Sequence, residues 1–519
     1  MSARWLLMLV GLATATSCSR GATDGARGSS DSAARPEPLD RWMERQAERS
    51  WGHLLRNISP EEPKVPGGPR PARGIVVGAL SKKDPDYYFH WIRDSSNVMR
   101  VVVEVSTSGR TTARPGRLPA MMRDFLALSR RLQTLPSRYG LGEPRFTVDA
   151  GVDTLPWSRP QNDGPALRAL TVVGYLRVLD RQAGGRARPD SLALEVLTTD
   201  LDFVATVWRA RCFDIWEEYN AENYHTRLVQ LSALEKGAGY LADHGLDPER
   251  VERYRAAAAG LEPLLDDHWD PARGFLRSQL VIVATDGYTA KKTDLDSAVL
   301  VAVMEADRDR PAHSVLDDRV QATVAVLEHL FRRAYPINAR TDVGLGYGRY
   351  QGDVYFGGNP WFLITAYYAE FYDRLARKLA EGATFEVTKR NLDFVREIAA
   401  GNGRDGGGAG DDVAVLARLR PGAVVRPGDP SHAQLIALLA GKGDAIVRRL
   451  QLHTPASGEI YEQFDKRTGA PTSSRGIGWG HSAFLSAALE RERLAAAMDR
   501  ARRAARPSVP SSSQTSTPR

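Results

Sequence analysis

The sequence predicts an all-α protein built as one large domain, and three observations support this. Apolar residues recur with the 3.6-residue period of a helix on the order of a dozen times along the chain. At some of these segments a capping side chain stands before a proline, as at the start of many helices. Strand patterns are weak, although residues 278–284 could form one arm of a short hairpin.

The first 18 residues have the pattern of an export signal. Arg4 precedes an apolar run, residues 5–13, and small residues follow as far as Cys18. The run is too short to span a bilayer. A lipoprotein signal, with Cys18 lipidated, and a plain secretory signal both stay open. The expected location is therefore outside the cytoplasm: periplasmic, in the outer membrane as a lipoprotein, or secreted. The only expected membrane contact is a lipid on Cys18.

Composition sets the bounds of the folded domain. Residues 19–38 and 507–519 are rich in small and polar residues and proline, and we predict that they form a disordered tether and a disordered tail. The folded domain is therefore expected to span residues 39–506.

Four apolar stripes carry the helical prediction most clearly. They are Met121, Phe125, Leu128 and Leu132; Ala169, Val172, Val173, Leu176 and Leu179; Leu194, Leu197, Leu201, Val204 and Trp208; and Val320, Val324, Leu327 and Phe331. Asn359 before Pro360 predicts a helix start. Asp429 before Pro430 predicts another, and Gly441 predicts the end of that helix.

Charge and cysteine content exclude several classes of protein. Lysine and arginine number 70 against 63 acids, so the surface is mixed and no nucleic-acid partner is expected. The basic run at 491–506 has helical spacing and predicts a solvated helix face. The chain has two cysteines, one of them in the signal, so a disulfide framework is excluded, and Cys212 is interpreted as a small buried residue. The glycine run at 406–410 predicts a flexible loop.

Two acidic clusters lie in the long loops between the predicted helices. Residues 214–220 place Glu217 and Glu218 beside Trp216, where burial and like charge would keep one carboxyl protonated. Residues 458–465 include Glu462. Taken alone, each cluster would be an ordinary helix cap or surface face. Together they offer the acid and the carboxylate that hydrolysis of a glycosidic bond needs.

Three further loops combine aromatic rings with charged side chains, at residues 87–95, 157–165 and 348–362. Aromatic rings pack on the apolar face of a sugar, while charged groups exchange hydrogen bonds with its hydroxyls. Each segment by itself would usually be core packing or a structural ion pair. Their combination predicts a sugar-binding site.

These segments, in this order, resemble glycoside hydrolase family 15, the glucoamylases. The matching blocks lie around Arg93, from Leu141 through Trp157 to Gln161, at Trp216–Glu218, from Gly348 to Trp361, and from Tyr461 to Trp479. They cover roughly residues 80 to 485. The resemblance implies an (α/α)6 barrel of six inner and six outer helices, with the site in a pocket at one end.

The resemblance also implies roles for individual residues. Glu217 would be the general acid and Glu462 the general base of a single displacement with inversion, with their carboxyls roughly 6.5 to 9.5 Å apart. The residues expected to bind sugar or line the pocket are Tyr87, Trp91, Arg93, Asp94, Trp157, Trp216, Glu218, Arg349, Asp353, Trp361, Gln463 and Trp479. No metal or cofactor is expected, and the protein is expected to be a monomer.

The implied reaction is release of β-glucose from the non-reducing ends of starch, glycogen or maltooligosaccharides at α-1,4 and, more slowly, α-1,6 bonds. Phe464, His481 and His90 depart from the family pattern, so dextran-type or trehalose substrates stay open. A non-catalytic glucan-binding lipoprotein, and a retaining hydrolase or phosphorylase on an α/α barrel, are the other hypotheses.

Overall fold

The computed structural model describes residues 37–109, 117–283, 291, 293–401 and 416–504. Contacts divide the chain into residues 1–38 and residues 39–519, and the fold below is that of the second unit. The predicted signal with Cys18, nearly all of the tether, the tail and the glycine run at 406–410 lie outside the described residues.

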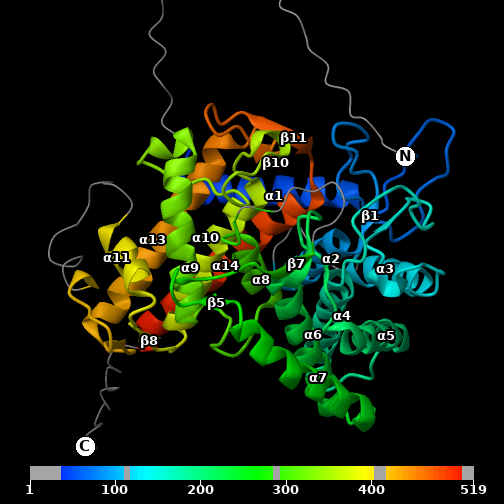
Figure 1. Ribbon diagram of the computed structural model, residues 1–519, viewed down its shortest axis with the longest axis horizontal. Helices are drawn as coiled ribbons and strands as arrows, with labels where there is room; N and C mark the ends of the chain where they lie inside the picture. Colours follow the sequence, from blue (N-terminus) through cyan, green and yellow to red (C-terminus); the bar gives the residue numbers. More distant parts are fainter. Residues whose placement is uncertain (1–36, 110–116, 284–290, 292, 402–415, 505–519) are drawn as a thin grey trace, which may run out of the picture. The chain divides into compact units, whose positions relative to one another are not determined.

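The described residues contain thirteen α-helices, and six of them form a closed ring. The ring helices, each packed against the next, are α2 (Ile92–Thr107), α4 (Asp163–Gln182), α6 (Tyr224–Asp243), α8 (Ala298–Ala306), α10 (Phe362–Ala380) and α14 (Gly478–Ala504). The ring closes because α14 also packs against α2. The helices between and around them are α1 (Leu39–Asn57), α3 (Arg117–Gln133), α5 (Ser191–Val207), α7 (Pro248–Asp266), α9 (Asp318–Ala334), α11 (Leu392–Ala400) and α13 (Pro430–His453). This is the (α/α)6 toroid that was predicted (Figure 1).

Burial explains which helices form the ring. All nine residues of α8 are buried, as are most residues of α4, α6 and α10, and a helix that is apolar on every side must be surrounded by other elements. The outer helix α9 instead buries one stripe and leaves Arg332 and Arg333 exposed at its end. The four predicted stripes lie in α3, α4, α5 and α9, with most of their residues buried.

Two predicted helix boundaries were wrong. Helix α10 begins at Phe362, after Trp361, because the side chain of Asn359 is used in the preceding loop, where it donates to the carbonyl of Phe356 (2.7 Å). Helix α13 begins at Pro430 as predicted but runs through Gly441 to His453. A mid-helix glycine costs only about 1 kcal/mol, less than the packing of the buried residues that follow it contributes.

Within the described ranges the strands are short and form five small sheets. The pairs are β1 (His90–Trp91) with β2 (Arg145–Phe146), β5 (Trp269–Asp270) with β6 (Phe275–Leu276), β8 (Phe385–Glu386) with β9 (Val424–Val425), and β10 (Tyr461–Phe464) with β11 (Pro471–Arg475), all antiparallel. A three-stranded sheet has the order β3 (Cys212–Phe213), β4 (Asn220–Asn223), β7 (Gln279–Val283). The described part of the predicted run, β7, thus pairs with β4, which is distant in sequence; residues 284–290, where a hairpin partner could follow, lie outside the described residues.

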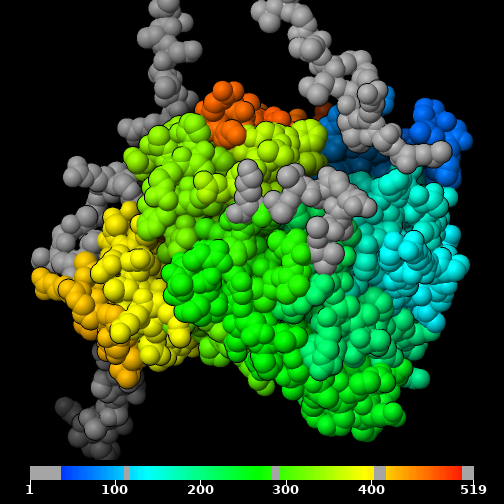
Figure 2. Space-filling model, in the orientation of Figure 1, coloured from blue at the N-terminus to red at the C-terminus, as the bar shows by residue number. Residues whose placement is uncertain are grey.

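The strands and loops that precede the ring helices hold the predicted site residues. Arg93 lies in the first turn of α2, Trp361 directly precedes α10, and Trp479 lies in the first turn of α14. At the opposite ends of the ring helices, Lys236 donates to the carbonyl of Ala306, and Arg374 to that of Met304. Figure 2 shows the orange surface of the β10–β11 region beside the yellow-green surface of the segment before α10. The ring therefore gathers the site residues at the N-terminal ends of its helices.

Candidate active site

Glu217 lies in a tight turn between β3 and β4 that Asp214 organises. One carboxylate oxygen of Asp214 accepts the backbone N–H groups of Glu218 (2.7 Å) and Tyr219 (3.1 Å), and the other accepts the amide of Gln279 (2.7 Å). Within this turn Glu217 has φ 65°, a left-handed conformation that non-glycine residues rarely adopt. Such a conformation costs of the order of 1–3 kcal/mol and persists where the surroundings impose it, often at functional sites.

Four N–H donors surround the carboxylate of Glu217. Its Oε1 accepts from Trp91 Nε1 (2.9 Å), Arg93 Nη2 (3.0 Å) and Gln161 Nε2 (3.0 Å). Its Oε2 accepts from Trp157 Nε1 (2.9 Å). These donors come from two segments, one at β1 and the start of α2 and the other before α4, that are distant in sequence from Glu217, so the position of the carboxyl group is set by tertiary contacts.

Glu462 lies on β10 at an irregularity of the β10–β11 pairing. The register shifts between Tyr461 and Gln463, and across from it Ser473 has φ 65°. The carboxylate accepts hydrogen bonds from the hydroxyls of Tyr87 (3.0 Å) and Ser473. Glu462 is only 2% exposed. Burial raises the pKa of Glu462 to about 7, because the effect of burial outweighs that of the two hydrogen bonds, which favour the charged form. A bulge is a frequent means of aiming a functional side chain.

The two carboxylates, although distant in sequence, are joined by a short series of contacts. Tyr87 bonds Glu462, and its ring lies 5.6 Å from that of Trp91, which bonds Glu217. Tyr355 also contacts Tyr87, because the two hydroxyl oxygens lie 2.5 Å apart. The pKa of Tyr355 is raised, first by burial, then by the charge of Glu462 and more weakly by that of Glu217. The fold therefore brings the two predicted catalytic carboxylates into one site; their exact separation stays a prediction.

Arg93 is the buried cation on the Glu217 side. Beside its bond to Glu217 it contacts Asp163 (3.1 Å), Gln161 (2.8 Å) and Asp94 (3.7 Å). Burial disfavours its charge, but the surrounding carboxylates outweigh this and raise the pKa of Arg93. Burial also raises the pKa of Asp94 to about 7. Apart from the contact with Arg93, the described residues give the Asp94 carboxylate no hydrogen bond, so its oxygens are available to a ligand.

Arg349 is the second buried cation. Its guanidinium bonds Asp353 through two nitrogens (2.8 and 2.5 Å) and pairs with Glu218 at 3.0 Å. Tyr350 donates to the other oxygen of Glu218 (2.6 Å). Arg349 and Tyr350 thus hold the two carboxylate oxygens of Glu218. The ring of Trp361 lies 5.3 Å from the guanidinium, and its buried N–H has no partner among the described residues.

Three further predicted site residues, Trp216, Trp479 and Gln463, are also buried. The indole N–H of Trp216 donates to Asp296 (3.0 Å), and that of Trp479 donates to the hydroxyl of Tyr367 (3.0 Å). The guanidinium carbon of Arg93 also lies over the indole of Trp479, 5.7 Å from the centroid of that ring. Gln463 has no exposed surface.

The side chain of Gln463 connects β10 to the loop before α10. Its amide accepts from Asn359 (3.1 Å) and donates to the carbonyl of Tyr355 (3.3 Å). The structure therefore places Gln463 where it supports the loop; its predicted contact with substrate stays a prediction.

Several residues of the site were not predicted as such. Gln161 lay in a matching block, Asp214 in the first acidic cluster and Tyr355 in an aromatic loop, so each had a sequence signal. Asp163 lay in the loop at 157–165, and the packing of α4 against α2 brings it to Arg93, whereas Ser473 had no signal of its own, because only the pairing of β10 with β11 brings it to the site.

The departures from the family pattern lie in the protein interior. Phe464 is fully buried between Phe362 and His453, and the ring of His481 accepts the backbone N–H of Ile460 (3.3 Å). His90 accepts the N–H of Val76, and burial lowers its pKa to about 3, as expected of a packing residue. Cys212 is likewise buried, and burial raises the pKa of its thiol to about 11.

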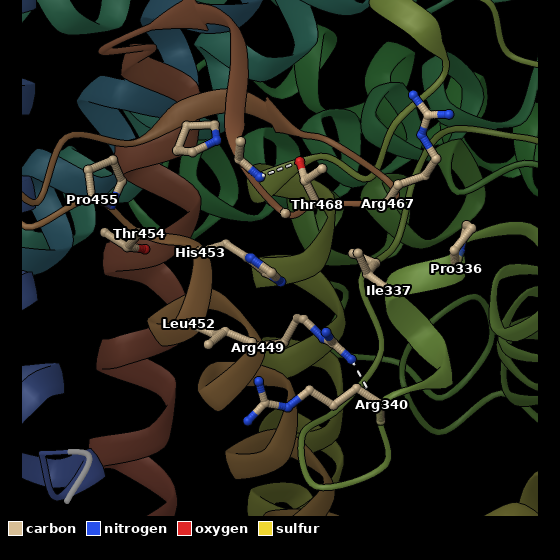
Figure 3. A pocket seen from close by; sticks show the side chains of 13 residues that line it. Pro336, Ile337, Arg340, Arg449, Leu452, His453, Thr454, Pro455, Arg467 and Thr468 are labelled. Carbon is tan, nitrogen blue, oxygen red and sulfur yellow. Dashed lines mark hydrogen bonds between the residues drawn. The ribbon is translucent and has the colours of Figure 1, made fainter. Parts of the chain in front are cut away.

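A separate hollow of about 600 Å³ is lined in part by the β10–β11 turn. Figure 3 shows Leu452 and His453 of α13 on one wall, with Ile337 and Pro336 opposite. No tryptophan, tyrosine or carboxylate lines it, so it does not have the chemistry predicted for a sugar site. Over the described ranges no cluster of His, Cys, Asp and Glu has the arrangement of a metal site, and no helix has the length and apolar character needed to cross a membrane.

Comparison with known proteins agrees with the predicted family and with this fold. The sequence profile described as "Glycosyl hydrolases family 15" matches residues 48–489. Glucoamylase of Blastobotrys adeninivorans is 30% identical over 464 residues, which are 85% of this chain and 69% of that protein. Glucoamylase P of Amorphotheca resinae is 31% identical over 452 residues, 84% of this chain and 67% of that protein.

Solved structures show the same fold. The glucoamylase of Hormoconis resinae is 27% identical with a TM-score of 0.74, covering 88% of this chain and 74% of that one. The glucoamylase of Saccharomycopsis fibuligera is 24% identical with a TM-score of 0.76, covering 89% and 98%. On the profile match, which spans most of the chain, this protein belongs to family 15 of the glycosyl hydrolases.

Proposed function

We propose that this family 15 hydrolase is a glucoamylase: it removes glucose from the non-reducing ends of α-glucans and maltooligosaccharides with inversion. The observation that carries the proposal is the series of contacts from Glu217 through Trp91 and Tyr87 to Glu462, which brings the proposed acid and base into one site. The similar proteins that are named glucoamylases support the same choice of substrate.

In the proposed mechanism Glu217 donates a proton to the glycosidic oxygen while Glu462 removes a proton from the attacking water. The bond from C1 to the leaving oxygen breaks, and the bond from C1 to the water oxygen forms on the opposite face. The hydroxyls of Tyr87 and Ser473 hold Glu462 in position. The product of one such displacement is β-glucose.

The terminal glucose would be held by the charged groups on both sides of the carboxylates. Asp94 has oxygens without hydrogen-bonding partners among the described residues, and Arg93 beside it supplies positive charge. On the other side Arg349 and the unpaired N–H of Trp361 are available to sugar hydroxyls. A charged or buried polar partner for each hydroxyl is what gives a sugar site its selectivity.

The raised pKa of Glu462 predicts the acidic limb of the pH profile. The base must be ionised, so kcat/KM should rise with pH through a midpoint above the ordinary 4.5 and near 7. In Ser473→Ala the loss of a hydrogen bond to the charged form should move the midpoint higher. Ser474→Ala is the matched control, because its hydroxyl bonds Ser81. An acidic-limb midpoint near pH 4.5, or a midpoint that Ser473→Ala does not change, would contradict this prediction.

Glucose release from maltose, isomaltose, dextran, trehalose and soluble starch, with the product anomer followed by NMR, tests the function directly. We expect α-1,4 substrates to be hydrolysed fastest and β-glucose to appear first. Faster hydrolysis of trehalose or dextran would assign another specificity. Initial α-glucose or a sugar phosphate would indicate a retaining hydrolase or a phosphorylase, and no turnover at all would favour a glucan-binding lipoprotein.

Export is part of the proposal and rests on the sequence of residues 1–18. Expression of the full chain in a bacterial host, followed by fractionation and mass spectrometry of the mature N-terminus, would test it. A diacylglyceryl group on Cys18 would identify a lipoprotein. A cleaved chain without this group would identify a secreted protein, and an intact chain in the cytoplasm would exclude both.

A further inference from the structure

Four large apolar side chains are exposed on the two loops that carry the outer residues of the site. Leu155 (55% exposed) and Trp157 (38%) belong to the loop that bonds Glu217. Val354 (84%) and Phe356 (42%) flank Tyr355 on the loop before α10. Exposed apolar groups that gather around a site usually mark a surface that binds something.

A continuous row of aromatic rings links the two loops. From Trp157 the row passes to Trp91 (6.0 Å between ring centroids), then to Tyr87 (5.6 Å). Tyr87 touches Tyr355 through their hydroxyls, and the ring of Tyr355 lies 4.8 Å from that of Phe356. In the middle of the row Trp91 is buried and Tyr87 and Tyr355 are half-buried beside the two carboxylates, and both ends of the row are exposed. The exposed ends therefore adjoin the catalytic groups and extend from them into solvent.

The turn that exposes Phe356 is strained and held in place. Phe356 has φ 47°, and Gly357 and Gly358 continue in the left-handed region with φ 95° and 63°. An aromatic residue there is unfavourable and persists only where neighbours impose it. Asn359 bonds the carbonyl of Phe356 (2.7 Å), and Lys466 bonds that of Gly357 (2.7 Å). The ring is thus kept partly exposed at a conformational cost, with the ring of Tyr355 as its aromatic contact among the described residues.

We propose that Val354 and Phe356, together with Leu155 and Trp157, form an apolar platform for the leaving group, so that the enzyme also hydrolyses α-glucosides of apolar alcohols. This inference rests on the proposed function. The buried groups already hold the terminal glucose, so whatever extends toward solvent is the other side of the scissile bond. Aliphatic side chains such as Val354 and Leu155 offer no partner to sugar hydroxyls but gain from covering methylene groups.

The reaction on such a substrate is the same hydrolysis. Water adds to C1 and gives its proton to Glu462, while the bond from C1 to the alcohol oxygen breaks. Glu217 protonates that oxygen, and the products are glucose and the free alcohol. No further reactant is needed.

Methyl and octyl α-D-glucoside, the latter below its micelle concentration, provide the test, because they share one leaving-group chemistry and differ only in apolar length. We expect the wild-type kcat/KM for octyl to exceed that for methyl by at least about tenfold, the effect of covering about two methylene groups. In Val354→Ser/Phe356→Ser the ratio should fall toward one, with hydrolysis of methyl glucoside unchanged. Leu452→Ser, 44% exposed beside the hollow of Figure 3, is the matched control and should keep the wild-type ratio.

Each outcome decides one point. Equal kcat/KM for octyl and methyl glucoside in the wild type, or an octyl preference that survives the double substitution, overturns the platform while hydrolysis of maltose leaves the proposed function intact. If the wild type cleaves neither maltose nor either glucoside, the proposed function itself has failed and the platform fails with it.

Discussion

Glu217→Gln and Glu462→Gln should each lower kcat for maltose by about 10²–10⁴-fold, the contribution of one positioned acid or base. Gln keeps the size of Glu but can neither protonate the leaving oxygen nor remove a proton from water. The loss of kcat in each variant should depend on whether the leaving group needs a proton. Fluoride leaves without protonation, so α-glucosyl fluoride should restore much of the rate in Glu217→Gln and little in Glu462→Gln. Steady-state kinetics on both substrates separates the two roles, and ordinary maltose activity in either variant would refute the assignment.

Stability measurements show whether these variants stay folded. Folding raises the pKa of Glu462 from 4.5 to about 7. Its contribution to stability is therefore fully present below pH 4.5 and is lost as the pH rises through 7. Gln carries no charge to bury, so Glu462→Gln should unfold at a higher temperature than the wild type at pH 8 and at a similar one at pH 4. A lower melting temperature at both pH values would mean that Glu462 is needed mainly for structure.

Arg168→Met is expected to cause the largest loss of stability, about 3–5 kcal/mol, because it leaves a buried carboxylate unpaired. Arg168 on α4 bonds both oxygens of Asp200 on α5 (2.6 and 2.8 Å), and the two side chains are 2% and 0% exposed. Gln133 of α3 bonds the same carboxylate (2.9 Å). The pair thus connects a ring helix to two outer helices. Since unfolding entropy grows with chain length, the melting temperature should fall by only about 3–5 °C.

Two controls distinguish the unpaired charge from general damage. Arg168→Met with Asp200→Leu removes both charges and should recover most of the loss. Arg255→Met breaks an exposed pair with Glu252 and should change stability by less than about 0.5 kcal/mol. Burial raises the pKa of Asp200, so protonation should shrink the loss in Arg168→Met at low pH. A wild-type melting temperature for Arg168→Met would contradict the importance of the pair.

Much of the architecture could be predicted from local patterns. The stripes in α3, α4, α5 and α9 are visible because a helix buries every third or fourth residue, and that period is written in the chain. Boundaries were less certain. Asn359 looked like a helix cap, yet its amide is used by the loop carbonyl of Phe356 and by Gln463. A capping residue has several possible partners, and only the folded loop selects one.

The sequence by itself determined the helical segments and, through the resemblance to family 15, the ring and the candidate carboxylates with their aromatic and arginine neighbours, since these depend on residue types and their order. The tertiary structure alone decided how they are held: the left-handed turn at Glu217, the bulge at Glu462 and the hydroxyl of Ser473 across from it. It also decided that Phe356 faces solvent. Burial and contacts between residues far apart in the chain set these features, and neither quantity is encoded by any short segment.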